Sequence, residues 1–290
     1  MAKNIGVCAL CNKTRTLKES HIVPKFIGKW LKNTSLTGHI RNVQEANKRA
    51  QDITKEYLLC GDCEQKFSNY ERPFAENIFK PHHRGIKELP YDEGLLNLII
   101  SIQWRVIVNR KSTLRGLSDE LLSHLDNAQE IFRQYLNDES DNYGDYSHHL
   151  FFVDTDTDMD TNFNNPNMYF QRSIDATIAS NGHSTLFVYT KLPGIIINSN
   201  IKPMDGWVNT EIKKEKGSIV FPQVIEVSGY SEFIESRINE SRNYNISSLQ
   251  VEKINKDIQI NIDKLDKSKS YKAALADINL KYHINNDEKV

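Results

Sequence analysis

The four cysteines of the chain form two identical pairs, and this pattern constrains the fold more than any other feature. In each pair two residues separate the cysteines, and the set is Cys8, Cys11, Cys60 and Cys63. Thiolates at this spacing bind one face of a tetrahedral zinc ion, and a second pair completes its four ligands. The metal would close the 48 residues between the pairs into a loop. We therefore predict a structural zinc site that organises an N-terminal module.

The composition is that of a globular protein, with 39% hydrophobic and 26% charged residues. The longest apolar run, residues 95–108, is interrupted by Gln103 and Arg105, so we expect no membrane-spanning segment. The first residues, Met-Ala-Lys-Asn, contain no apolar signal region, which predicts a cytoplasmic location. In that reducing compartment, paired cysteines act as metal ligands more often than as disulfides.

The charge of the chain is unevenly distributed. Residues 1–90 hold 16 Lys and Arg against 9 Asp and Glu, whereas the rest holds 21 against 29. A basic first third favours binding of a polyanion such as nucleic acid. Charge alone leaves open a second interpretation, in which the basic face is solvated and has no partner.

The pattern of apolar residues predicts an α+β protein in three parts. A helical connector over 82–145 contains two predicted helices, 92–111 and 118–136, the second with Ser118 as its N-cap. It joins a zinc-binding module over 1–81 to an α+β domain of unknown role over 146–290. In this last region we expect an antiparallel sheet, because short β-rich runs alternate with Pro and Gly. The predicted strands are 185–192, 194–201, 207–213 and 218–221.

Two segments of the last region are harder to interpret. Residues 169–179 favour a helix, on which Arg172 and Asp175 would form an ion pair three residues apart. The acidic run 154–160 resembles a calcium-binding loop but lacks the Gly and Glu that such a loop requires at its sixth and twelfth positions. We expect a flexible acidic loop there.

The segment Glu19-Ser-His-Ile-Val-Pro-Lys-Phe26 lies between the cysteine pairs, and the second pair opens a predicted helix. Together these features resemble the HNH nuclease family on its treble-clef (ββα-metal) scaffold, over roughly residues 5–80. The resemblance implies a metal-dependent endonuclease that acts on nucleic acid, DNA in the first place, with His21 as the general base. It also implies a phage-defence or mobile-element effector.

The chain departs from the family pattern at three positions. Ser20 stands where the family has an Asp or His metal ligand, Lys55 where it has Asn, and Glu64 where it has His. A carboxylate suits Mg²⁺ or Mn²⁺, so Glu64 is the first candidate ligand for a catalytic ion. Glu71, two helical turns later, is the second, and Asp52 in the polar segment 33–56 is a further acid.

Basic residues surround this module, and four of them are candidates for contacting phosphates: Lys25, Arg41, Arg49 and Lys55. The departures from the family pattern support an alternative function, a catalytically inactive zinc-binding module that contacts nucleic acid or protein. In that case His21 would be a structural residue that bonds to the backbone and packs under the zinc site. The region after residue 81 offers a surface for a protein partner in either case.

Overall fold

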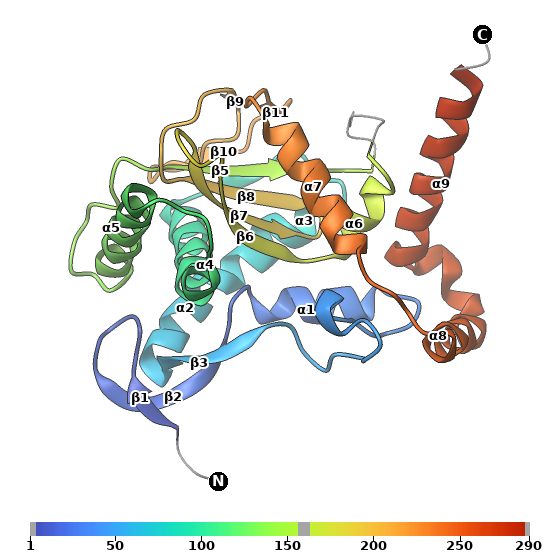
Figure 1. The fold of residues 1–290 in the computed structure, drawn as a ribbon, viewed down its shortest axis with the longest axis horizontal. Helices are drawn as coiled ribbons and strands as arrows, with labels where there is room; N and C mark the ends of the chain where they lie inside the picture. The colour runs from blue at the N-terminus through green and yellow to red at the C-terminus, as the bar shows by residue number, and fades with distance from the viewer. Residues whose placement is uncertain (1–3, 156–162, 288–290) are drawn as a thin grey trace.

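The computed structural model describes residues 4–155 and 163–287, and Figure 1 shows its arrangement. Most of the acidic run predicted as a flexible loop, from Asp156 on, lies outside these ranges. In the described part of the chain, no helix is both long enough and apolar enough to cross a membrane. The described elements form an α+β structure with antiparallel sheets, as the sequence predicts.

The N-terminal part contains a three-stranded antiparallel sheet in the order β1-β2-β3. Its strands are β1 (Ile5–Val7), β2 (Thr14–His21) and β3 (Lys55–Cys60). The register between β2 and β3 shifts between Lys18 and Glu19, so the end of β2 is offset relative to β3. Between β2 and β3 the chain forms helix α1 (Lys25–Asn33) and the short 3₁₀ turn η1 (Val43–Glu45).

Helix α2 (Gly61–Pro73) starts directly after β3, as the predicted helix at the second cysteine pair does. It runs on through a π-helical stretch, η2 (Phe74–Phe79), and one last turn, α3 (Lys80–His82). Pro73 has no N–H to donate, which accounts for the change from α- to π-helical geometry at this point. Pro81 lies within this final turn, and the helical run ends one residue later.

Helix α4 (Glu93–Arg110) is the central element of the fold, and it packs against α2, α5 (Asp119–Leu136) and the larger sheet. Most of its side chains are buried, as the nearly continuous apolar run predicts. The Ser118 hydroxyl accepts a hydrogen bond from the Leu121 N–H, which confirms the predicted N-cap of α5. A 3₁₀ turn, η3 (Lys111–Thr113), follows α4 directly.

The larger sheet has four antiparallel strands in the order β5-β8-β7-β6. Every residue of β7 is buried, because both faces of the sheet are covered. Leu186 and Val188 pack into the core shared with α4, whereas Phe187 and Tyr189 alternate with them and pack towards helices α6 and α7. The strands are β5 (Ser147–Phe152), β6 (Asp175–Ser180), β7 (Leu186–Leu192) and β8 (Ile195–Asn200).

The helix predicted over 169–179 is wrong in its second half. Helix α6 (Pro166–Arg172) ends before strand β6 begins, so Arg172 and Asp175 belong to different elements. They do not form the predicted pair: Asp175 bonds to Arg237, and Arg172 donates to the carbonyl oxygen of Leu31. Tertiary pairing with β7 overrides the local helical pattern here.

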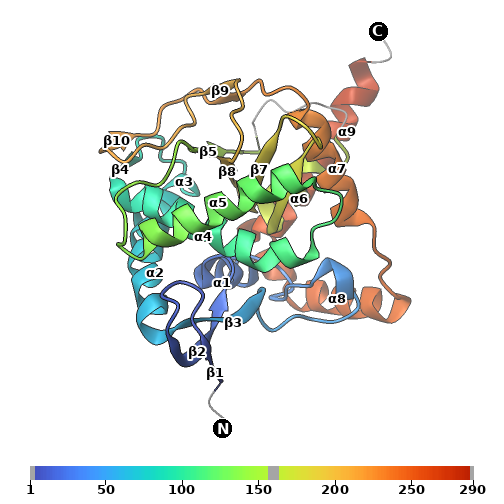
Figure 2. The same cartoon turned by 60° about the vertical axis from the view of Figure 1, so that its left-hand side comes forward.

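Two-residue strands and four C-terminal elements complete the fold. The short strands pair as β4 (Pro90–Tyr91) with β10 (Gly217–Ser218), and β9 (Trp207–Val208) with β11 (Val224–Ile225). Figures 1 and 2 show α7 across the sheet, α8 beside the segment that joins α1 to β3, and α9 against α6. These elements are α7 (Tyr230–Arg242), α8 (Ser248–Ile260), the 3₁₀ turn η4 (Ile262–Lys267) and α9 (Lys269–Asp287).

One buried apolar cluster extends from the cysteine module through α4 to the larger sheet. It includes Leu10 and Phe67 of the module, Trp104 of α4 and Val188 of the sheet. The apolar core is therefore continuous across the domain boundaries predicted near residues 81 and 145. Those boundaries stay predictions.

Candidate metal centre and adjacent polar pocket

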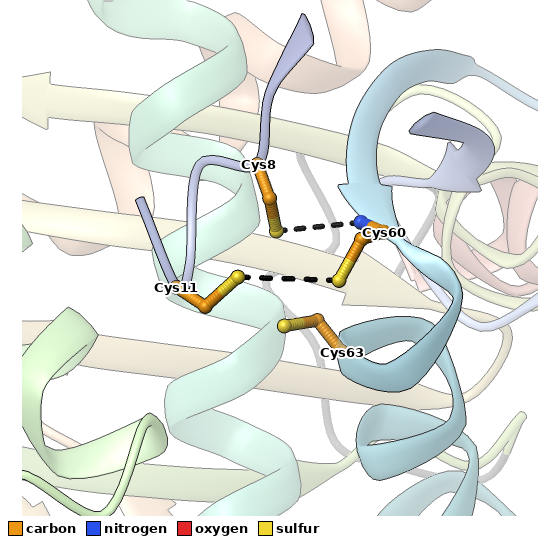
Figure 3. Close-up of side chains that lie close together, drawn as sticks. All are labelled: Cys8, Cys11, Cys60 and Cys63. Atoms are coloured by element: carbon orange, nitrogen blue, oxygen red, sulfur yellow. Dashed lines mark hydrogen bonds between the residues drawn. The ribbon is translucent and has the colours of Figure 1, made fainter. Parts of the chain in front are cut away.

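The four cysteines come together at one point, although 48 residues separate the two pairs. Their sulfur atoms all lie within 4.8 Å of one another (Figure 3). Cys8 and Cys11 lie on the loop between β1 and β2, Cys60 ends β3, and Cys63 lies in the first turn of α2. The four thiols are positioned to hold a metal ion, which confirms that part of the sequence prediction.

The surroundings of the thiols differ from one sulfur to the next. Burial raises the pKa of the Cys8 thiol, but backbone N–H groups of Cys11, Cys60 and Leu10 outweigh this and lower it overall. Among these donors, the Cys60 N–H lies 3.3 Å from the Cys8 sulfur. Burial raises the pKa of the Cys63 thiol, and the neighbouring thiols raise it further. Several thiolates this close together need a cation to offset their charge.

His21 is the last residue of β2, and its side chain is fixed by Asp52. The Nε2 atom of His21 lies 2.9 Å from Oδ2 of Asp52, while Oδ1 of Asp52 accepts a hydrogen bond from the Ile53 N–H. Burial raises the pKa of Asp52, but the hydrogen bonds from His21 and Ile53 lower it more, and the pKa lies below its usual range. Asp52 was considered as a metal-binding acid, and in the structure it bonds to the imidazole.

Glu64 is held in place by Ser20. The Ser20 hydroxyl donates to Oε2 of Glu64 over 2.6 Å, and it accepts a hydrogen bond from the Leu59 N–H. Ser20 is completely buried, and its contact with Leu59 is buried, whereas its contact with Glu64 is partly exposed. The result is a carboxylate in the first turn of α2 with one oxygen fixed by a buried hydroxyl.

His21 and Glu64 line the same surface pocket, which has a volume of about 350 Å³. The pocket lies beside the cysteine cluster, since Gly61 forms part of its wall and directly follows Cys60. Lys25, at the start of α1, adds a positive charge to the same wall. The remaining lining residues are Lys18, Glu19, Gln65 and Ser68.

Glu71, the second predicted acid, does not line this pocket. Its Oε1 atom lies 2.9 Å from Nη1 of Arg105, whose side chain is 2% exposed. The same Nη1 atom donates to the carbonyl oxygen of His21 over 2.8 Å. In the sequence, Arg105 stands out only as an interruption of an apolar run. A charged residue within an otherwise buried helix was the available sign that it has a polar partner.

The four predicted phosphate-binding residues do not lie together. Lys25 borders the pocket of His21, whereas Lys55 forms an ion pair with Glu19. Arg41 and Arg49 lie further along the segment between α1 and β3, and both contact helix α8. The structure therefore brings two of the four close to the candidate general base: Lys25 lines its pocket, and Lys55 lies opposite His21 in the pairing of β2 with β3.

No family model matches the chain, and neither a curated protein nor a solved structure shows significant similarity to it. Any function must therefore be argued from the residues and the geometry described above. The observations that matter most are the cysteine cluster, the pair formed by His21 and Asp52, and the pocket that His21 shares with Glu64.

Proposed function

We propose that the cysteine cluster binds a structural zinc ion within a treble-clef module. A tetrahedral zinc site with Zn–S bonds of about 2.3 Å requires sulfur atoms roughly 3.8 Å apart. The Cys11 and Cys60 sulfurs are 4.0 Å apart, and all four lie within 4.8 Å, so small side-chain movements suffice to close the site. An all-thiolate set with no open position suits a structural role.

We further propose that the chain is an endonuclease of HNH type that hydrolyses phosphodiester bonds in nucleic acid. The observation that carries this proposal is the pocket beside the cysteine cluster, which His21 and Glu64 line together with Lys25. A phosphodiesterase site needs a base, an anionic ligand for a cation and positive charge for the phosphate. The three residues supply one of each.

The contact with Asp52 fixes the tautomer of His21 that a general base at Nδ1 requires. Asp52 has a lowered pKa and is ionised at neutral pH, so it accepts a hydrogen bond from Nε2–H of His21. This leaves Nδ1 with a free lone pair, which takes the proton from the attacking water. Asp52 then stabilises the imidazolium that forms, and Lys25 offsets negative charge on the phosphate.

Glu64 is the residue that would hold Mg²⁺ or Mn²⁺, because hard cations prefer carboxylate oxygens. Such an ion stabilises the charge that develops on the phosphate during hydrolysis. Ser20 fixes one oxygen of Glu64 and leaves the other to bind a cation. The fit is partial, since Glu71 is bonded to Arg105, and Glu19, the other carboxylate that lines the pocket, forms an ion pair with Lys55.

DNA is the substrate we propose first, with the basic segment between α1 and β3 contacting its backbone. The resemblance to HNH nucleases also supports a role as a phage-defence or mobile-element effector. The region after residue 81 would then recognise the target or a protein partner.

The partial fit of the cation site also supports the alternative, a zinc-binding module that contacts nucleic acid or protein without cutting it. Only Glu64 of the two predicted acids lines the pocket, and the Ser20 hydroxyl already engages it. In this alternative the pair of His21 and Asp52 stabilises the end of β2 and the loop that precedes β3.

The two proposals are separated by a cleavage assay. Purified zinc-loaded protein is incubated with supercoiled plasmid and Mg²⁺ or Mn²⁺, beside His21→Ala and the control His183→Ala, which alters an exposed turn between β6 and β7. The nuclease proposal expects nicking that His21→Ala abolishes and His183→Ala retains. Binding without cleavage of duplex DNA, single-stranded DNA or RNA would favour the inactive module.

A further inference from the structure

The segment between α1 and β3, residues 34–54, will be called the insertion, and helix α8 covers part of it. Nη2 of Arg49 lies 2.6 Å from Oδ2 of Asp257 on α8, and Nη2 of Arg41 donates to the side-chain oxygen of Gln250 over 3.4 Å. Figures 1 and 2 both show α8 lying beside the insertion. The two arginines predicted to contact phosphates are thus engaged by side chains of the same helix.

The attachment of α8 to the insertion is polar. None of its 13 residues is buried, and Ile260 at its end is 66% exposed. The residues just before α8 are also held by polar contacts. The side chain of Asn47, in the insertion, donates to the Asn245 carbonyl oxygen and accepts a hydrogen bond from the Ser247 N–H. Its contact face is half-buried, at Gln250, Ile254, Asp257 and Ile258 of α8, and a helix with no fully buried side chain separates from its support at lower cost than the helices on either side of it.

Both ends of this covering segment are anchored by contacts outside α8, and the later end also holds the start of the insertion, where the Lys269 N–H donates to the Thr34 carbonyl oxygen and the Leu36 N–H donates to the Ser270 hydroxyl. Before it, Ile234 and Ile238 of α7 are buried against the sheet. After it, Asp277 of α9 accepts hydrogen bonds from the N–H groups of Asn167 and Met168 at the start of α6. Helix α8 can therefore move away from the insertion while the helices on either side stay in place.

The chemistry of the contact indicates what would displace α8. The Asp257 carboxylate offers Arg49 the anionic oxygens that a phosphate would offer, and guanidinium groups bind both. A single ion pair at the surface is worth little, whereas a nucleic-acid backbone presents many phosphates and releases counterions on binding. In competition for Arg49, a nucleic-acid backbone is therefore favoured over the Asp257 carboxylate.

We propose that α8 is a displaceable cover over a phosphate-binding surface that includes Arg41 and Arg49. The free protein holds the surface closed through Asp257 and Gln250, and nucleic acid binds by displacing the helix. This inference rests on the nucleic-acid binding proposed above, and it adds a control over access that does not involve His21 or the metal centre.

Binding to a fluorescein-labelled DNA duplex, followed by anisotropy at low salt, tests the proposal. Asp257→Asn removes the competing charge and keeps the shape of the side chain, so the affinity for DNA should rise roughly threefold or more. Glu252→Gln removes the same charge from an exposed position of the same helix and is the matched control. An equal rise in DNA affinity in both variants would mean that net charge alone causes it, and would overturn the proposal that α8 is a cover.

A double-mutant cycle then identifies the partner of Asp257. Arg49→Gln should weaken binding, and in that background Asp257→Asn should have no further effect, because the two side chains act through one contact. Additive effects of the two substitutions would contradict the proposal. Both positions are partly exposed, so the variants are expected to fold.

Hydrogen exchange shows directly whether α8 moves. On addition of DNA, backbone amides of the insertion should exchange more slowly and those of Ser248–Ile260 more quickly. Slower exchange in both the insertion and α8 would mean that α8 forms part of the binding surface. The proposal of a displaceable cover would then be wrong, even if His21-dependent cleavage is observed. If neither the native chain nor Asp257→Asn binds duplex DNA, single-stranded DNA or RNA, the cover and the nuclease proposal fail together.

Discussion

Nη1 of Arg105 lies 2.8 Å from the carbonyl oxygen of His21, although the two residues are 84 positions apart in the sequence. The contact joins the central helix α4 to the end of β2, where the candidate general base is located. Arg105 also pairs with Glu71 on α2, and its guanidinium lies over the ring of Phe67. One buried cation therefore links the central helix to two elements of the N-terminal module.

Removal of Glu71, the partner of the buried Arg105 guanidinium, should destabilise the protein. In Glu71→Ala the charge of Arg105 stays buried with its counterion gone, which should cost on the order of 3 kcal/mol in the free energy of unfolding. Glu76→Ala is the control, because it breaks an exposed pair with Lys80 in the same helical run. Its cost should stay below about 1 kcal/mol. Urea denaturation of zinc-loaded protein measures both free energies of unfolding. Equal losses in the two variants would show that the buried pair stabilises the protein no more than the exposed one.

Loss of one sulfur ligand should release the metal and unfold the module around it. Cys60→Ser removes the ligand at the junction of β3 and α2, and a hydroxyl does not replace a thiolate on zinc. We expect the metal content, measured by mass spectrometry, to fall from one equivalent to near zero. Chelation of the native chain should reproduce the effect, and addition of zinc should reverse it in the native chain. A Cys60→Ser protein that retains its metal and its thermal stability would argue against a four-thiolate site.

In the proposed nuclease, Asp52 should contribute to catalysis without binding substrate. Asp52→Asn keeps the shape of the side chain but removes the charge that fixes the His21 tautomer, so kcat for plasmid nicking should fall roughly 10- to 100-fold with KM little changed. Asp145→Asn, in an exposed loop, is the matched control and should leave both constants unaltered. A change in KM alone would assign Asp52 to substrate binding.

The clustering of the four cysteines in space was predictable, because two pairs with this spacing most often bind one metal ion together. Likewise, helices α4 and α5 followed from long apolar patterns and from Ser118 as an N-cap, both of which are local properties. The α-helix beginning at Lys25 was not predicted, since it is short and lies within a basic stretch. Strand β6 was missed because pairing with β7, and not its own sequence, determines its conformation.

Within the candidate site, the sequence identified residues but not their partners. His21 and Glu64 were named from their positions in a motif, and they line one pocket. The roles of Asp52 and Arg105 depend on contacts across 31 and 84 residues, which no local pattern encodes. Glu71 was a candidate cation ligand from helical periodicity alone, and the structure pairs it with Arg105 instead.

Asp175 and Arg237 provide a test of pH dependence away from the candidate site. Both oxygens of Asp175 accept hydrogen bonds from Arg237, and Tyr169 donates a further one. Burial raises the pKa of Asp175, but the contacts with Arg237 outweigh this and hold the pKa below its usual range. Because the pKa is lower in the folded chain than in the unfolded one, the ionised carboxylate stabilises the fold.

The lowered pKa of Asp175 determines the pH range over which its carboxylate stabilises the fold. The stabilisation is fully present above the unfolded pKa of about 3.9 and is lost as the pH falls through the lower folded value. Asp175→Asn should therefore be less stable than the native chain by a constant amount between about pH 7 and 5, and this difference should shrink below about pH 4. Glu232→Gln, exposed on α7, should show little difference at any pH. Urea denaturation across this range measures the difference, and a gap that widens towards low pH would mean that Asp175 is protonated in the folded chain.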